Sequence, residues 1–324
     1  MDWTLTLAAL GIGIVVGLTG MGGGALMTPV LVLFFGIPPL TAVSSDLVAA
    51  AVMKPVGSLV HMRDGNVRWE LVRWLCLGSV PGAFGGVLIL RALGSDAEVQ
   101  DVVETALGVA LLVAALGLGV RAWIAMVQRA KVRDGRAPAH PPVLRKLAVK
   151  PVPTVLIGLV GGTVVGITSA GSGSLIIIAL MALYPGLLAR ELVGTDLVQA
   201  VPLVAAAALG HILFGDFQLS VTLPLLVGSI PGAFIGANLS SRLPGSLVRR
   251  ALAFVLLASS LKLLGLSTPL TGVVLAVVLV AAPPAWMLLR RRYGFPALRR
   301  RSARPDDTAA APDETSEPEA TPAS

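Results

Sequence analysis

Two glycine-rich stretches carry residue types that suit the binding of a small anion inside an apolar environment. The first is Gly17-Leu18-Thr19-Gly20-Met21-Gly22-Gly23-Gly24, and the second is Gly166-Ile167-Thr168-Ser169-Ala170-Gly171-Ser172-Gly173-Ser174. Glycine is a poor helix former and allows positive φ angles, so each stretch predicts a break in a helix. The helix that restarts after the break points free N–H groups and the positive end of its dipole toward the break. An anion can accept hydrogen bonds from these N–H groups and is stabilised by the dipole.

The residues expected to bind the anion lie at these breaks or, for Lys54, carry a positive charge inside a span. They are Thr19, Gly22, Gly23, Gly24, Lys54, Thr168, Ser169, Gly171, Ser172 and Gly173. The alternative for the glycines is helix packing through small residues, which accounts well for Gly82, Gly85 and Gly86. The hydroxyl groups can instead cap the second half-helix, and Lys54 can pair with an acid or extend to the membrane edge.

Asp46 and Asp196 are the acids inside predicted spans, where an ionisable side chain is costly and needs a reason. One reason is coupling of transport to protons through a carboxylate that gains and loses a proton. The other is helix capping, because Ser-Ser-Asp and Gly-Thr-Asp both resemble helix starts. The sequence leaves coupling and capping open for both residues.

The elements that position these groups are two overlong apolar runs. The run from Trp3 to Phe35 would extend roughly 50 Å as one helix, against a hydrocarbon core of about 30 Å. We therefore expect two half-helices, Trp3–Leu18 and Gly24–Phe35, joined by a glycine turn at membrane depth. The run from Val152 to Tyr184 is interrupted in the same way. Irregular backbone at that depth requires protein or a watered cavity around it.

An internal duplication relates the two halves of the chain. Asp46 matches Asp196, His61 matches His211, and Ser79–Phe84 matches Ser229–Phe234, each at a spacing of 150 residues (196 − 46, 211 − 61, 229 − 79). Several landmarks in one register are poorly explained by coincidence. The halves are therefore expected to have the same order of helices.

Composition places the chain among polytopic helical membrane proteins. Of its 324 residues 55% are hydrophobic and 13% are charged, and the mean hydropathy is +0.84. A soluble enzyme with one anchor is excluded, because no hydrophilic stretch is long enough for a domain. The net charge of +7 gathers in loops, so it indicates membrane orientation rather than nucleic-acid binding. With one cysteine and three histidines, we expect no metal site, no cofactor and no enzymatic activity.

These features predict an all-α polytopic membrane protein made of two inverted repeats and one extra C-terminal transmembrane helix. Each repeat has a glycine-broken re-entrant helical hairpin and three transmembrane helices. The expected parts are a first repeat at 1–120, a cytoplasmic basic linker at 121–150, a second repeat at 151–265, an additional span at 266–292 and a disordered cytoplasmic tail at 293–324. The basic linker and tail favour a cytoplasmic C-terminus.

The chain resembles the TauE/SafE family of membrane proteins, also described as sulfite or organosulfonate exporters. The resemblance is carried by Gly17–Gly24, Ser45-Asp46, Val80–Gly86 and their second-half copies, and it covers Leu5 to Leu264. It implies a multi-pass carrier in the cell inner (plasma) membrane that moves small anions such as sulfur oxyanions, sulfonates or small carboxylates. It does not fix the substrate.

We therefore expect a secondary transporter that holds its anion at the paired glycine breaks near the midplane and works by alternating access. An anion channel, or a membrane sensor or assembly factor, remains as the alternative. Direction, proton coupling and assembly into a homo-oligomer stay open.

Overall fold

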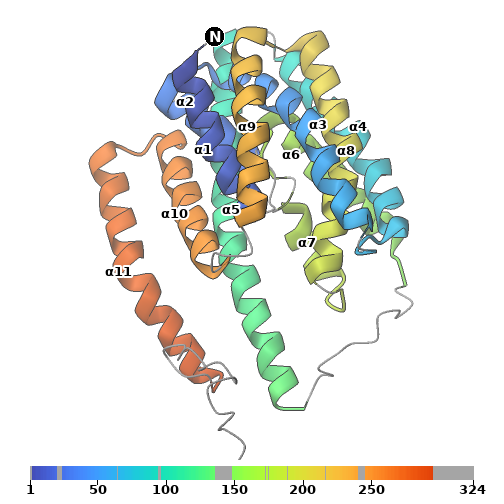
Figure 1. Ribbon diagram of the computed structural model, residues 1–324, viewed down its shortest axis with the longest axis vertical. Coiled ribbons are helices and arrows are strands. Elements are labelled where there is room, and N and C mark those ends of the chain that lie inside the picture. The colour runs from blue at the N-terminus through green and yellow to red at the C-terminus, as the bar shows by residue number, and fades with distance from the viewer. Residues whose placement is uncertain are drawn as a thin grey trace, which may run out of the picture. The chain divides into compact units, whose positions relative to one another are not determined.

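The regular elements of the computed structural model are all α-helices in the residues that it describes (Figure 1). Those residues are 2–19, 24–63, 65–93, 96–135, 148–171, 173, 175–187, 189–215, 217–239 and 245–294. The helices are α1 (Trp3–Thr19), α2 (Gly24–Phe35), α3 (Pro39–Arg63), α4 (Trp69–Ala92), α5 (Asp96–Arg133), α6 (Pro151–Thr168), α7 (Leu175–Leu183), α8 (Ala189–Phe214), α9 (Leu219–Leu239), α10 (Gly245–Leu263) and α11 (Thr268–Arg292).

The chain divides into two compact units, Met1–Leu279 and Val280–Ser324. The described residues of the first unit form the helices α1 to α10 and the start of α11. In the second unit the described residues are the end of α11, which carries Arg290, Arg291 and Arg292 in its last turn, and the turn that follows.

Within the described residues, six helices are long and apolar enough to cross a membrane, namely α4, α5, α6, α8, α9 and α11. Helices α1 and α2 are apolar but shorter. The predicted break in the first apolar run agrees with these bounds, because α1 ends at Thr19 and α2 starts at Gly24. The second run is divided between α6 and α7.

Helix α5 corrects one predicted boundary. The span was expected to end at Val120, with the polar linker starting at Arg121, yet the helix continues to Arg133. The added segment is rich in Ala, Arg, Met, Gln and Lys, which are strong helix formers, and it contains neither Gly nor Pro. The single charge of Arg121 therefore marked neither the end of the helix nor the end of the candidate span, which runs from Ala97 to Val127.

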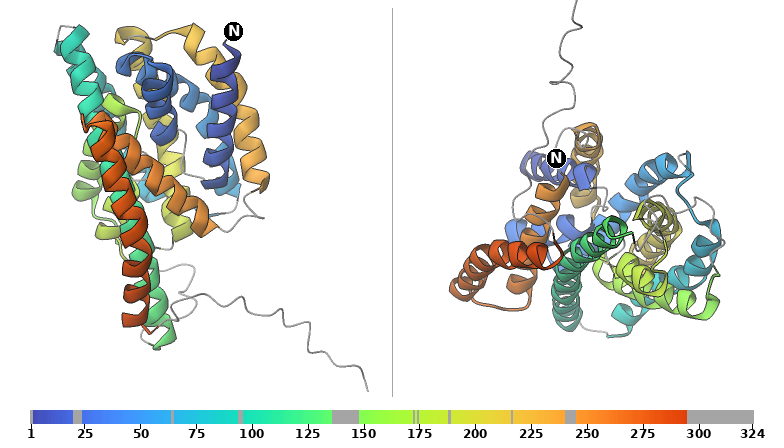
Figure 2. Two further views of the ribbon diagram at one scale, coloured as in Figure 1. Left: turned by 90° about the vertical axis from the view of Figure 1, so that its left-hand side faces the viewer. Right: turned by 90° about the horizontal axis from the view of Figure 1, so that it is seen from below.

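Two closely packed helix pairs join the halves of the chain. Helix α4 packs along α6, and α1 packs along α9, which lies beside it in both figures (Figures 1 and 2). Under the 150-residue register α4 corresponds to α9 and α6 corresponds to α1. The two pairs are therefore equivalent contacts. In one pair the first half contributes α4, and in the other pair the second half contributes its counterpart α9. Helix α3 packs against its own counterpart α8, and α5 against α10.

Rows of small residues allow the backbones of these pairs to touch. A methyl group added at Gly82 of α4 would overlap the carbonyl of Leu159 in α6, and one added at Gly162 would overlap the carbonyl of Ser79. In the matching pair, a methyl group at Gly232 of α9 would overlap the carbonyl of Leu10 in α1. Gly85 has open space beside it instead. Helix packing thus accounts for Gly82 but does not account for Gly85.

Candidate functional site

The second glycine stretch leaves helical geometry at Ser169, the residue after α6. Ser169 adopts a left-handed conformation with φ 57° and ψ −14°, and its N–H donates to the carbonyl of Val165 at 2.8 Å. Gly171 and Gly173 follow with φ of 114° and 101°. Residues with a side chain rarely adopt these backbone angles, so the two glycines allow the chain to turn before α7. A buried serine held at positive φ marks a constrained position.

The two hydroxyl groups at this break have different partners. Thr168 Oγ1 donates to the carbonyl of Val164 at 2.7 Å and accepts from the N–H of Ala170 at 3.2 Å, so it serves the main chain of the break itself. Ser169 Oγ instead donates to Asp46 Oδ2 in α3 at 2.7 Å. Of these two expected ligands, Ser169 is the one whose hydroxyl reaches a charged group.

Asp46 connects the second broken segment with the first. Its Oδ2 accepts a hydrogen bond from Thr28 Oγ1 at 2.8 Å, as well as the one from Ser169. Thr28 lies one turn into α2, the half-helix that begins at Gly24 after the first break. One carboxylate oxygen therefore holds a residue from each broken segment. Asp46 itself is 1% exposed.

The position of Asp46 and Asp196 corrects the capping alternative. Helix α3 begins at Pro39 and α8 begins at Ala189, so both acids lie about two turns inside a helix. Neither residue can therefore cap the helix that carries it, since a capping side chain accepts from N–H groups of the first turn. Both acids are fully buried, at 1% exposure each.

Lys54 is a buried cation that interacts with both acids. It lies about two turns after Asp46 on α3, is 7% exposed, and interacts electrostatically with Asp196 and with Asp46. An ammonium group buried inside a helix bundle requires such compensation. The structure thus brings Lys54 together with both acids, which the sequence left as one of several alternatives.

Asp196 has a different set of neighbours. Its Oδ1 accepts from Gln199 Nε2 at 3.1 Å, and Gln199 Oε1 accepts from Ser79 Oγ of α4 at 3.1 Å. Arg121 of α5 also interacts electrostatically with Asp196. The carboxylate is therefore linked to α4 through an amide and to α5 through a positive charge.

Four of these polar residues were not among the predicted site residues: Thr28, Ser79, Arg121 and Gln199. The duplication offers a signal for one of them. Gln199 corresponds to Ala49, so it places a polar group where its counterpart has none. A polar residue that departs from the repeat inside a span is a sign of function.

Several predicted ligands lie wholly or partly outside the described residues. Gly22, Gly23 and Ser172 are among the residues that the structure does not describe. Thr19 is the last residue of α1 and Gly24 the first of α2, but the orientation of the Thr19 side chain is likewise outside the description. Their assignment as ligands stays a prediction.

His211 lies inside the helix bundle. Its ring is fully buried, with Nε2 donating to the carbonyl of Gly166 at 2.7 Å and Nδ1 lying 2.8 Å from Ser44 Oγ. A carbonyl can only accept, so the proton lies on Nε2 and Nδ1 accepts from the serine in the neutral ring. The histidine thereby ties α8 to α3 and α6.

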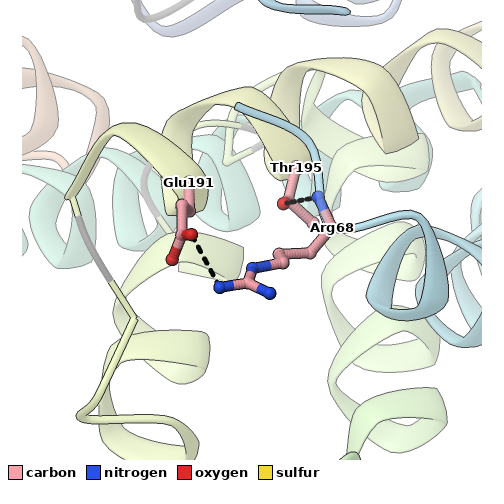
Figure 3. Close-up of polar contacts among 3 residues, drawn as sticks. All are labelled: Arg68, Glu191 and Thr195. Carbon is pink, nitrogen blue, oxygen red and sulfur yellow. Dashed lines mark hydrogen bonds and ion pairs between the residues drawn. The ribbon is translucent and has the colours of Figure 1, made fainter. Parts of the chain in front are cut away.

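An ion pair joins the segment before α4 to the start of α8. Arg68 Nη2 lies 2.7 Å from Glu191 Oε1, and the backbone N–H of Arg68 donates to Thr195 Oγ1 at 3.0 Å (Figure 3). The counterparts of Arg68 and Glu191 are Gln218 and Thr41, which are uncharged. The counterpart of Thr195 is Ser45, whose buried Oγ has no hydrogen-bond partner among the described residues.

Asp46, Lys54, Arg121 and Asp196 form a set of two acidic and two basic side chains that are linked by electrostatic interactions. Hydroxyl and amide donors surround the acids, and the two cations can compensate a bound anion. No group of three or more His, Cys, Asp or Glu side chains that could hold a metal ion occurs in the described part of the chain.

The chain is similar to one described protein family and to several probable membrane transporters. The family described as "Sulfite exporter TauE/SafE" matches residues 5–263. A probable membrane transporter protein of Bacillus subtilis, YjnA, is 37% identical over 265 residues, covering 82% of this chain and 100% of that protein. A second one from the same organism, YdhB, is 25% identical over 242 residues, covering 74% of this chain and 91% of the relative.

A probable membrane transporter protein of Xylella fastidiosa is 26% identical over 250 residues, covering 76% of this chain and 88% of that protein. No solved structure gives a significant match.

Proposed function

The chain belongs to the sulfite exporter TauE/SafE family of membrane transporters, and from this premise we propose that it is a secondary transporter of a small anion. The proposed substrates are sulfite, a sulfonate or a small carboxylate. The family description supports both the sulfur oxyanion and the outward direction. The resemblance inferred from the glycine motifs is confirmed, because the family match covers nearly the same residues.

One observation carries the proposal of a shared site. Thr28 from the first broken segment and Ser169 from the second both donate to Asp46 Oδ2, and the Lys54 ammonium interacts with the same carboxylate. Two interrupted helices and a buried cation therefore meet at one place. The proposed ligands are the break residues Thr19, Gly22, Gly23, Gly24, Thr168, Ser169, Gly171, Ser172 and Gly173, together with Lys54.

We propose further that the halves are inverted repeats with re-entrant hairpins. The exchange of partners between the pairs α4–α6 and α1–α9 supports a two-fold relation between the halves. Each half has a broken pair of helices and three further helices. If the broken pair returns to its own side, three crossings remain, and an odd number inverts the second half. Rocking one half against the other would then alternate access to the site.

The basic loops support an orientation in the inner membrane with the C-terminus in the cytoplasm. Arginine and lysine gather in the 121–150 linker and in the flank that begins at Arg290. A tag at the C-terminus tests this orientation, because modification of the tag from outside intact cells would contradict it.

Flux measurements in proteoliposomes test the transport proposal. The purified protein is reconstituted, and uptake of labelled sulfite, thiosulfate, methanesulfonate, sulfoacetate and acetate is compared with protein-free vesicles. Saturable uptake with counterflow is expected for at least one anion. The Lys54→Met variant should reduce it more than about tenfold, because the buried site loses its compensating charge.

Lys54→Arg serves as the matched control, since it keeps the positive charge. Size-exclusion profiles confirm that each variant is folded. Absence of flux for every anion would overturn the proposed function, and single-channel conductance without counterflow would assign a channel instead.

A further inference from the structure

The charged groups of the site are balanced without a substrate. In their ordinary ionised forms, Asp46 and Asp196 each carry one negative charge, and Lys54 and Arg121 each carry one positive charge. Lys54 interacts with both acids and Arg121 with Asp196. The four groups together therefore carry no net charge when the site is empty.

The surroundings of Asp196 do not alter this balance. Helices α6 and α7, which pack against α8, have no ionisable side chain in their described residues. Other ionisable groups near α8 are already engaged. They are His211 with Ser44 and Gly166, Glu191 with Arg68, Arg91 over the Phe214 ring, and the Cys76 thiol 4.0 Å from the Gln199 carbonyl. Arg249 interacts with Arg121 but is exposed, so solvent screens it.

A monovalent anion entering this site leaves one negative charge uncompensated. Burying an unpaired charge within a membrane protein is energetically costly, so a charged complex would reorient slowly. Addition of one proton to a carboxylate of the site restores neutrality. The empty site, being neutral already, can return without a solute.

We propose that a monovalent anion and one proton occupy this site together and that Asp196 takes the proton, which makes transport electroneutral cotransport. The inference rests on the proposed function and adds the coupling ion and its residue. The Asp196 carboxylate binds a proton from solution on one side as the anion enters. It releases that proton on the other side as the anion leaves.

Hydrogen bonding selects Asp196 over Asp46. Asp46 Oδ2 accepts from two hydroxyl groups that come from the two broken segments, at 2.7 and 2.8 Å. Neutralising that carboxylate weakens both charge-assisted bonds and loosens the junction of the segments. Asp196 accepts one described side-chain bond, from Gln199 on its own helix. Its protonation disturbs less of the structure, and Gln199 can rotate its amide to accept instead.

The test uses full-length protein in proteoliposomes with labelled methanesulfonate, which stays a monovalent anion between about pH 6 and about pH 8. For the wild type, a proton gradient should drive net uptake, and a clamped membrane potential should change that uptake less than about twofold. Methanesulfonate flux that depends on potential but not on the proton gradient would overturn the inference.

The Asp196→Asn variant gives the sharper result. Its empty site carries an uncompensated positive charge, whereas its loaded site is neutral. We expect net uptake to fall more than about tenfold, while exchange of labelled for unlabelled methanesulfonate continues within about threefold of wild type and loses its pH dependence. Proton-driven net uptake that persists in this variant would overturn the assignment of Asp196.

Two further variants separate coupling from folding. Asp196→Glu keeps the carboxyl group and should retain proton-driven uptake. Asp101→Asn removes an exposed acid from α5 and should behave as wild type. If the wild type carries methanesulfonate without proton coupling, the inference fails and the transport proposal stands. If the wild type carries none of the tested anions, the transport proposal fails as well. If the wild type carries other anions but not methanesulfonate, only the inference about a monovalent anion fails.

Discussion

The two halves of the chain meet at two seams, which are the helix pairs α4–α6 and α1–α9. These seams follow the internal duplication more closely than the polar site does. In the seams, Gly82 packs on Leu159 as its counterpart Gly232 packs on Leu10. At the site, Asp46 accepts from two hydroxyl groups, whereas its counterpart Asp196 accepts from an amide and faces Arg121. Packing between backbones tolerates little variation, so both copies were kept. At the polar site the two acids have different partners, so its two sides are not equivalent.

The largest expected effect tests the equivalence of the seams. Gly82→Leu and Gly232→Leu should each destabilise the protein by about 3 kcal/mol or more, because the added side chain meets backbone that cannot move aside. Thermal melting of the detergent-solubilised protein measures this change. Both variants should lose stability to a similar extent.

Gly85→Ile is the control, since Gly85 has open space around it and its counterpart Ile235 is half exposed. Its melting temperature should stay close to that of wild type. If only one of the two leucine variants were destabilised, the seams would not be equivalent.

The second effect sharpens the difference between the acids. Asp46→Ala should cost about 1–2 kcal/mol more stability than Asp196→Ala, because it leaves two buried hydroxyl groups without an acceptor and separates the two broken segments. The same melting assay compares the two variants. Adding Thr28→Val and Ser169→Ala to Asp46→Ala should then produce little further loss. Equal losses for the two single variants would indicate that Asp46 does not join the segments.

The smallest effect compares Thr195 with its counterpart Ser45. Thr195→Val removes the acceptor for the Arg68 N–H and should cost about 1 kcal/mol. Ser45→Ala removes a buried hydroxyl group that has no described partner, so it should be neutral or slightly stabilising. Chemical denaturation resolves such differences better than melting. A loss for Ser45→Ala as large as that for Thr195→Val would show that the serine has a partner after all.

The sequence predicted most of the helices because their signals are local. The half-helices Trp3–Leu18 and Gly24–Phe35 differ from α1 and α2 by one residue, since the glycine run both ends the first and starts the second. The 150-residue register identified matching helices before any contact was known. The boundary predicted at Arg121 from its charge was wrong, because helix α5 continues to Arg133.

The site was less predictable because its contacts join distant segments. Ser169 and Lys54 were named as ligands, yet the bond from Ser169 to Asp46 spans 123 residues. The bond from Thr28 to the same oxygen depends on how α2 lies against α3, which periodicity does not specify. Capping was considered for both acids because Ser and Thr precede them, but α3 and α8 begin two turns earlier than that pattern suggests.

The crossed pairing of helices has a consequence for the integrity of the chain. Helix α1 finds its partner in α9 and α4 finds its partner in α6, so neither half contains the surface that completes its own glycine rows. Each half therefore packs one of its helices against a helix of the other half at two separate places. A nick in the 136–147 stretch should therefore leave the fragments bound to each other, and two separately expressed fragments should reassemble where one alone is degraded.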